Sequence, residues 1–558
     1  MKVLINKEHG WSQYKDRETC VWFKGHGIKK NFSLLIDWIS KFNKYQNLSE
    51  VKHSYICRFI NTLSGHFSII IKMPIGVIMI VDKVNSISLY YAKCKNEIIV
   101  GNNAKTIFNK YSGKFKDVNK KSFLEMFMSG YTIGRKTLFH NLYRLQAGEY
   151  ACIDEKDIKI NHCYTYSPWK YPEVALDNIE GKFEHSILQP MQQLINDAGD
   201  RAIVVPLSAG KDSRLVVSAL KYLGAKKIFC FAYGSESAFE SKISRAVANR
   251  LGIDWIHVPL TISGQKDYFR SIEFREYSNN LDTLSSITFL QDVYVIRYLL
   301  SNKLIPYDAI IVNGNTGDFL SGGHILPVFK DKNYCDKELL IRTAWSQYLD
   351  KHYSLWGVLR NQKNDEYLIE ESTKIMEERG ISLSLESECL FGYFETLEYL
   401  QRQSKYVVNM QRSYDFYELE WRMPLWSETY MNFWESVRLN DKFNQSFYIR
   451  ILKKLNWGEV WKDIPINNYS NQINPYWIRP LRNTSKLFFT LFARNRWHQF
   501  EKNKLFYFMD DASNMAIVPY SKVFMDKRNF RNDFSWITDV YLKMHNLTWR
   551  NLEYSGVL

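Results

Sequence analysis

The sequence predicts an α/β protein with an antiparallel, β-rich front part and a back part built on a parallel sheet. Before about residue 165, short apolar or alternating segments are separated by Gly, Asn and Ser, a pattern typical of antiparallel strands; they are 54–59, 65–72, 76–82, 88–92 and 98–101. From Leu176 onward, helical periodicity alternates with single apolar strands at 202–207, 227–232 and 309–313. Strands that alternate with helices form parallel sheets covered on both faces.

Length and composition agree with two large domains. The chain has 558 residues, and domains usually contain roughly 100–200 residues. Apolar residues make up 46% and charged residues 24%, which suits globular cores. Residues 163–176, with Pro168 and Pro172, are the expected linker. After about Lys330 the chain is mostly helix-like, and after Asn474 it is rich in Arg and aromatic residues without a recognisable motif.

The composition and the first residues also bear on secretion, membrane insertion and the redox state of the cysteines. The first ten residues lack the apolar run of a secretory signal, and the apolar stretch 67–81 is broken by Lys72, Pro74 and Gly76, so it predicts two strands and a turn rather than a membrane span. The eight cysteines have no metal-ligand spacing and suggest neither a disulfide framework nor a zinc site. We therefore expect reduced thiols, a cytoplasmic location and no membrane insertion.

The formal charge of +15 suits an anionic partner such as ATP, a nucleotide-sugar, a nucleic acid or a membrane surface, and does not choose among them. Lys and Arg are spread along the chain rather than gathered in one stretch. This distribution favours solvated faces over a nucleic-acid site.

A candidate phosphate loop lies between a strand and a helix in 201–220. Unpaired amides at a helix start, together with the helix dipole, form a site for a phosphate group. Ser208 and Ser213 offer hydroxyl donors, and Gly210 permits close backbone approach. Asp212 would repel phosphates unless it helps to hold magnesium or caps its own helix. A simple helix cap is the alternative for the whole segment.

The run from Leu207 to Ser213 resembles the pyrophosphate loop of PP-loop ATP pyrophosphatases, Ser-Gly-Gly-x-Asp-Ser, with Ala209 in place of the first Gly. Residues 231–253 resemble the second nucleotide-binding strand and helix of asparagine synthetases. This resemblance would place Leu207 and Tyr233 near adenine. Within that segment, Ser237 and Glu240 have the spacing of a capping box, which we favour over a catalytic role for Glu240.

A third match, 312–324, is similar to the Gly-Glu-Gly-x-Asp-Glu-x-x-Gly-Gly segment of asparagine synthetases. The matching residues are Gly314, Asp318, Gly322 and Gly323. In that family the aspartate helps to bind magnesium and pyrophosphate, so the resemblance gives Asp318 this role with Asp212 as its partner. Asn315 and Phe319 stand where the family has carboxylates, which puts recognition of the carboxylate substrate or the nucleophile in question.

Residues 419–426 look like the family segment Val-Glu-x-Arg-x-Pro-Phe-Leu-Asp, with Ser427 replacing the last aspartate. The resemblance makes Glu420 and Arg422 candidates to line the cleft, with Glu420 positioning or deprotonating the nucleophile. An exposed surface pair is an equally good reading of Arg422. The family also uses a lysine in the C-terminal region, and Lys462 is chosen over Lys453 and Lys454 for that role.

The front part resembles the class II glutamine amidotransferase domain of asparagine synthetases at 61–70, 81–91, 101–105 and 131–148. The resemblance implies an Ntn-type αββα-like sandwich for residues 1–165. It implies a PP-loop (adenine nucleotide α-hydrolase-like) parallel-sheet domain with added helices for 176–558. A working glutaminase of this class uses a cysteine at position 2, where this chain has Lys2. We therefore predict that glutamine hydrolysis is lost, as in β-lactam synthetases and lasso-peptide cyclases.

Together these features predict an ATP- and Mg²⁺-dependent carbon–nitrogen ligase that adenylates a carboxylate for attack by an amine or ammonia. The sequence leaves open whether the carboxylate belongs to a small molecule, a sugar or a peptide, in polysaccharide or secondary-metabolite biosynthesis. It is also compatible with a homo-oligomer. Two alternatives stay open: a catalytically degenerate nucleotide-binding scaffold and a PP-loop enzyme that modifies tRNA. The front domain argues against the second of these.

Overall fold

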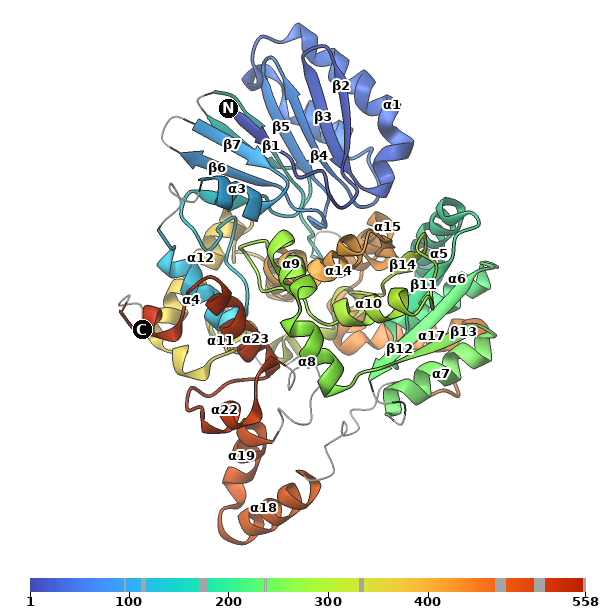
Figure 1. Cartoon of the computed structure of the whole chain (residues 1–558), viewed down its shortest axis with the longest axis vertical. Helices are drawn as coiled ribbons and strands as arrows, with labels where there is room; N and C mark the ends of the chain where they lie inside the picture. Colours follow the sequence, from blue (N-terminus) through green and yellow to red (C-terminus); the bar gives the residue numbers. More distant parts are fainter. Residues whose placement is uncertain are drawn as a thin grey trace.

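The computed structural model describes residues 1–94, 97–111, 117–155, 157–169, 178–234, 236, 238–330, 336–466, 478–505 and 517–554. Two β-sheets form the front part of the chain, at the top of Figure 1, and a third lies in the back part below them, on the right of the view. The α/β class predicted from the sequence is confirmed. Among the described helices, none is long and apolar enough to cross a membrane.

The front sheets hold six and four strands. The larger has the order β10-β9-β5-β4-β3-β2 and is antiparallel throughout; its strands are Ile158–His162, Glu149–Ile153, Gly76–Val81, Ser68–Met73, Thr19–Lys24 and Ser12–Asp16. The smaller has the order β1-β7-β6-β8, with strands Lys2–Leu4, Glu97–Gly101, Tyr90–Cys94 and Leu142–Arg144. Only the β1–β7 pair of these described strands is parallel.

Alternating side chains build the layers of the front part. Along β4, Ile69 and Ile71 point into a core shared with α1 (His26–Ser40) and α2 (His53–Ile60), whereas Ile70 points into the core between the two sheets. On the far side, Ile99 of the smaller sheet packs with residues of α3 (Ala104–Tyr111). The four layers are therefore helix, sheet, sheet and helix, as expected for an αββα sandwich.

One predicted strand is wrong. Residues 54–59 lie within α2, where Ile56, Phe59 and Ile60 are buried. Their spacing of three and four residues places them on one face of a helix, and that face packs on the larger sheet. By composition alone the apolar residues in this segment fit a strand, but their spacing has the periodicity of a helix.

The back sheet is parallel and has the order β13-β12-β11-β14-β15. Its strands are Asp254–Pro259, Ile228–Gly234, Ile203–Pro206, Ile310–Val312 and Glu420–Arg422. All three residues of β14, and Val204 and Val205 of β11, are fully buried, because both faces of the sheet are covered. The predicted strands at 202–207, 227–232 and 309–313 are confirmed within one or two residues.

Helices surround this sheet. Those nearest to it are α5 (Ile179–Ala198), α6 (Asp212–Tyr222), α7 (Phe239–Leu251), α10 (Val293–Ser301) and α14 (Gln411–Phe416). The others are α4 (Lys120–Ser129), α8 (Ile262–Arg270), α9 (Ile272–Asn280), α11 (Lys337–His352), α12 (Gln362–Glu377), α13 (Leu390–Glu398), α15 (Glu428–Glu435), α16 (Leu439–Lys442), α17 (Ser446–Leu455), α18 (Ile478–Phe492), α19 (Trp497–Lys504), α22 (Tyr520–Met525), α23 (Asp533–Met544) and α24 (Trp549–Tyr554).

Buried charges join the front and back parts. Glu149 of β9 accepts hydrogen bonds from Arg135 and, at 3.3 Å, from Arg379 of the back part. Burial by itself raises the pKa of Glu149, but the charges of the two arginines lower it below the ordinary value. Lys24 of β3 donates to Asp415 of α14 at 2.5 Å. The interface is therefore held by specific polar contacts as well as by apolar packing.

Cys57 of α2 and Cys163, directly after β10, form a disulfide. The expectation of reduced thiols is wrong for this pair. The two residues are 106 positions apart, and only the packing of α2 on the larger sheet brings them together. The expected linker begins at Cys163, but residues 170–177 and thus Pro172 and Leu176 lie outside the described part of the chain. The boundaries 1–165 and 176–558 stay predictions.

Candidate active site

The loop between β11 and α6 is organised by its own serines. Ser208 donates its backbone amide to the Ser213 Oγ at 3.0 Å, and the two hydroxyl oxygens lie 3.1 Å apart. Gly210 donates its amide to the Ser208 Oγ at 3.1 Å. The loop follows the carboxyl end of a central strand of a parallel sheet, where ligands of such sheets bind. It therefore has the position and the donors that a phosphate site requires.

The loop after β14 lies directly against this first loop. A side chain at Gly314 would place its Cβ 2.7 Å from the Ser213 amide nitrogen, and one at Gly317 would place its Cβ 2.5 Å from an Asp212 carboxylate oxygen. Glycine is required at Gly314 because the contacted atoms are backbone atoms of the helix start, so the match there has a steric reason. At Gly317 a Cβ would instead displace the Asp212 carboxylate, a contact that the sequence did not indicate.

Asp212 and Asp318 are brought together as predicted by the resemblance. The Asp318 amide donates to Asp212 Oδ2 at 2.8 Å, and the Tyr448 hydroxyl of α17 donates to Asp212 Oδ1 at 3.0 Å. Burial, followed by the nearby charge of Asp318, raises the pKa of Asp212 to about 7. The Asp318 side chain is 54% exposed, so a ligand can reach it.

His324 links Asp318 to a buried carboxylate. Its Nε2 lies 3.2 Å from Asp318 Oδ2, and its Nδ1 lies 2.5 Å from Oε1 of Glu398. Burial opposes protonation of His324, but Glu398 and Asp318 raise its pKa to about 9. Lys351 and His352 also contact Glu398, at 3.2 and 3.0 Å. Sequence reasoning missed this cluster, although His324 directly follows the Gly322-Gly323 pair of the matched segment.

The two aspartates fit Mg²⁺ as part of a shared site. Mg²⁺ is commonly bound by one or two carboxylates, together with water and substrate phosphates, rather than by a full protein cage. In the described part of the chain no group of three or more His, Cys, Asp or Glu has the geometry of a metal site. A cation between Asp212 and Asp318 would relieve their mutual repulsion, and the phosphates of a bound nucleotide would complete its ligands.

The predicted adenine side lies on the neighbouring strand. Leu207 is buried and donates its amide to the Phe231 carbonyl at 2.8 Å. The Tyr233 hydroxyl, at the end of β12, accepts from Gln291 at 2.6 Å and donates to Asp292 at 3.2 Å. Both residues are at the carboxyl edge of the sheet, next to the loop. Contact with adenine stays a prediction for both.

Glu420 does not lie at this edge. It is the first residue of β15 and pairs in register with Ile310, the first residue of β14, so it lies at the amino end of the sheet. There it accepts from Arg201 at 2.8 Å. The predicted role of Glu420 in the cleft does not fit this position, because the phosphate loop follows the opposite ends of the strands. Arg422 is buried, and its guanidinium lies 3.5 Å from Glu420.

Lys462 lies on a segment that is attached to the phosphate loop. Arg214 of α6 donates to the carbonyls of Val460, Ile464 and Pro465, and also to that of Ala209 in the loop. Lys462 itself is exposed. Its segment therefore lies next to the phosphate loop, but within the described part of the chain no contact joins the Lys462 ammonium group to the site. The catalytic role of Lys462 stays a prediction. Ser237 of the expected capping box lies outside the described residues.

A family comparison identifies this back part. Residues 197–458 match the asparagine synthase family model. These residues, somewhat less than half of the chain, are similar to an asparagine synthase domain, and the region is named for that similarity. This match supports ATP-dependent formation of a carbon–nitrogen bond as the general class of reaction. The matched residues include both loops and all five strands of the parallel sheet. No curated protein matches the whole sequence at a significant level.

Two solved structures show weak similarity. One is described as the allosteric regulatory enzyme of purine biosynthesis, with 9% identity, 44% of this chain and 62% of that chain covered, and a TM-score of 0.19. The other is glutamine phosphoribosylpyrophosphate amidotransferase from B. subtilis complexed with ADP and GMP, with 10% identity, coverages of 54% and 63%, and a TM-score of 0.18. This chain thus spans about three fifths of the length of each.

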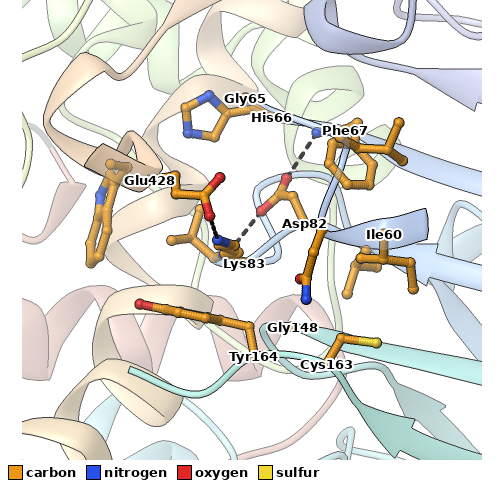
Figure 2. Close-up of a pocket in the computed structure, with 15 residues that line it drawn as sticks. Ile60, Gly65, His66, Phe67, Asp82, Lys83, Gly148, Cys163, Tyr164 and Glu428 are labelled. Atoms are coloured by element: carbon orange, nitrogen blue, oxygen red, sulfur yellow. Dashed lines mark hydrogen bonds and ion pairs between the residues drawn. The ribbon is translucent and has the colours of Figure 1, made fainter. Parts of the chain in front are cut away.

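A pocket lies where the front sandwich meets the asparagine synthase domain (Figure 2). Asp82 accepts the Phe67 amide at 3.0 Å, and Lys83 forms an ion pair with Glu428 of α15. His66 lines the pocket, is 4% exposed, and has both ring nitrogens without a hydrogen-bond partner. Burial and then the charge of Arg422 lower its pKa to about 3, so this histidine is neutral.

The front sandwich has no cysteine where a class II glutaminase needs one. Lys2 begins β1 and forms an ion pair with Glu97 at 2.6 Å. Cys20, the cysteine nearest to the start of the sequence, lies on β3 in the other sheet of the sandwich. Loss of glutamine hydrolysis stays a prediction.

Proposed function

We propose that the protein joins a carboxylate to an amine or ammonia and converts ATP to AMP and pyrophosphate. A carboxylate oxygen attacks the α-phosphorus, and the bond to the β-phosphate breaks with departure of pyrophosphate. The amine nitrogen then attacks the acyl carbon, loses a proton, and displaces AMP to leave an amide. The observation that carries the proposal is the contact between the Asp318 amide and Asp212, which brings two family-matched loops to one sheet edge.

Each loop has a separate part in this proposal. The amides and hydroxyls of Ser208 to Ser213 would hold the departing pyrophosphate, since they lie at the start of α6. Asp212 and Asp318 would hold Mg²⁺, which would balance the charge of the phosphates. Tyr448 and His324 would keep the two carboxylates in place through their hydrogen bonds. Leu207 and Tyr233 would border the adenine.

The nitrogen source is ammonia or an amine rather than glutamine. Lys2 occupies the position of the required cysteine, and its side chain forms an ion pair with Glu97. The front sandwich would then serve as a structural partner of the asparagine synthase domain, consistent with the buried ion pairs that join them. The acyl group belongs to a small molecule, a sugar or a peptide, and a uronate of a polysaccharide precursor is one candidate.

A nucleotide-binding scaffold is the second candidate function. It is favoured by Phe319, which replaces a family carboxylate, is fully buried, and packs near Tyr166 and Trp426. A phenylalanine in this position can bind neither metal nor proton. The scaffold would bind ATP at the same loop without cutting it.

The test measures release of pyrophosphate and AMP with Mg²⁺, a panel of carboxylates, and ammonium, amines or glutamine. We expect release with ammonium or an amine and none with glutamine alone. Asp318→Asn should lower the rate at least a hundredfold, because it removes a metal ligand. Asp308→Asn is the matched control, since Asp308 is an exposed aspartate before the amino end of the same strand. ATP binding without AMP in every combination would favour the scaffold.

A further inference from the structure

Helix α18 exposes an apolar face at one end of the molecule. Its large side chains Leu487, Phe488, Leu491 and Phe492 are 63%, 58%, 68% and 74% exposed. Figure 1 shows α18 beyond α19 and α22, away from all three sheets. Exposed apolar side chains are ordinary when scattered, but four on one short helix form a patch.

The opposite face of α18 is the one that packs on the protein. Phe489 contacts Phe500 of α19 at a ring-centroid distance of 4.8 Å and Trp497 at 5.9 Å. Arg482 donates to the largely buried Glu501 of α19 at 2.6 Å. These contacts fix the rotation of the helix about its axis. The apolar patch therefore faces outward, because the opposite face of α18 packs on α19.

The surroundings of the patch are strongly basic. Residues 478–504 contain seven Lys or Arg and one acidic residue, Glu501, which pairs with Arg482. Lys486, Arg494 and Arg496 are exposed. A helix with an exposed apolar face of Leu and Phe and basic residues around it is the type that lies in the headgroup region of an anionic bilayer. Nucleic acids would use the basic residues but not the aliphatic face, and an apolar protein groove would not use the charges.

We propose that α18 is a membrane-surface helix that binds the chain peripherally to a bilayer containing anionic lipids. Leu487, Phe488, Leu491 and Phe492 enter the boundary between headgroups and acyl chains, and the basic residues contact the lipid phosphates. This binding does not depend on the proposed reaction. It assigns a role to part of the C-terminal region in which the sequence shows no motif.

The test is co-sedimentation of the full-length chain with vesicles of phosphatidylcholine alone or of phosphatidylcholine with 30% phosphatidylglycerol. We expect binding to the anionic vesicles at least tenfold tighter than to the neutral ones, and weaker binding at high salt. The Leu491→Ser/Phe492→Ser variant should bind at least tenfold more weakly, because two apolar side chains no longer enter the bilayer. Both residues are exposed, so the variant should retain its thermal unfolding midpoint.

The matched control is Ile272→Ser/Tyr307→Ser, which removes two apolar side chains of 72% and 68% exposure far from α18 in the sequence. It should bind vesicles like the unmodified chain. Equal binding to neutral and anionic vesicles, or equal loss in both variants, would overturn the proposal. So would self-association in sedimentation equilibrium that Leu491→Ser/Phe492→Ser abolishes in a chain that binds no vesicles, since a second copy would then cover the face.

Discussion

Lys442 and Glu395 form a fully buried ion pair beneath the candidate active site. Their side chains are 0% and 3% exposed, and Lys442 Nζ lies 2.7 Å from Glu395 Oε2 and 2.8 Å from the Tyr166 hydroxyl. Burial lowers the pKa of Lys442 and raises that of Glu395, so each charge depends on the other. The Lys442 carbonyl also lies against Gly322, where a Cβ would approach it to 2.2 Å.

Replacing Lys442 by Met should therefore destabilise the protein by about 3–5 kcal/mol, because Glu395 is left buried without a partner. The Lys442→Met/Glu395→Leu variant should lose less than either single variant, since no lone charge remains. Lys454→Met is the control: Lys454 and Glu180 also form a close pair, at 2.5 Å, but are 62% and 43% exposed, and the loss should be at most about 1 kcal/mol.

The assay is urea unfolding followed by tryptophan fluorescence, with free energies compared only among variants that share one m value. If Lys442→Met costs no more than the Lys454→Met control, the buried Glu395 carries no such penalty. If the double variant loses the sum of the two single losses, the two charges are independent.

Four further predictions follow from the site and the interface. Gly314→Ala should weaken ATP binding at least tenfold in calorimetry, since its Cβ would displace the start of α6; unchanged affinity would remove the steric argument. Glu420→Gln should leave the rate of pyrophosphate release within about twofold, and a large loss would restore its catalytic role. Non-reducing peptide mapping should find Cys57 joined to Cys163, and reduction should cost about 2–5 kcal/mol of stability. Glu149→Gln should cost about 3–5 kcal/mol of unfolding free energy at pH 7. Because the folded pKa of Glu149 is lowered, this contribution is complete above its unfolded pKa of about 4.3 and should shrink as the pH falls below that value. A constant difference between the two proteins from pH 7 to pH 3 would contradict the assignment.

The strand–loop–helix arrangement of the candidate phosphate loop could be predicted because it is local. Strand, loop and helix are consecutive, and Ser208, Gly210 and Ser213 hydrogen-bond within six residues. The pairing of Asp212 with Asp318 was predictable only through the family resemblance, since 106 residues separate them. Tyr448, which lies 236 residues from Asp212, left no signal in the sequence.

The departures of the structure from the sequence-based expectations have physical causes of the same kind. Glu420 lies in a segment that matches the family motif, but the motif does not show which end of a strand Glu420 occupies. The pairing of Glu420 with Ile310 places Glu420 at the amino end of its strand. The disulfide between Cys57 and Cys163 depends on a helix packing on a distant strand end. Neither the strand end that Glu420 occupies nor the contact between Cys57 and Cys163 can be read from the spacing of residues along the chain.

In the proposed reaction, a carboxylate is activated by transfer of AMP at the loop from Ser208 to Ser213. Exchange of radiolabelled pyrophosphate into ATP, with Mg²⁺ and a carboxylate substrate but no nitrogen donor, measures this step alone. We expect exchange that requires the carboxylate and is lost in Asp318→Asn but not in Asp308→Asn. Amide formation with release of ADP and phosphate, and without exchange, would exclude AMP transfer.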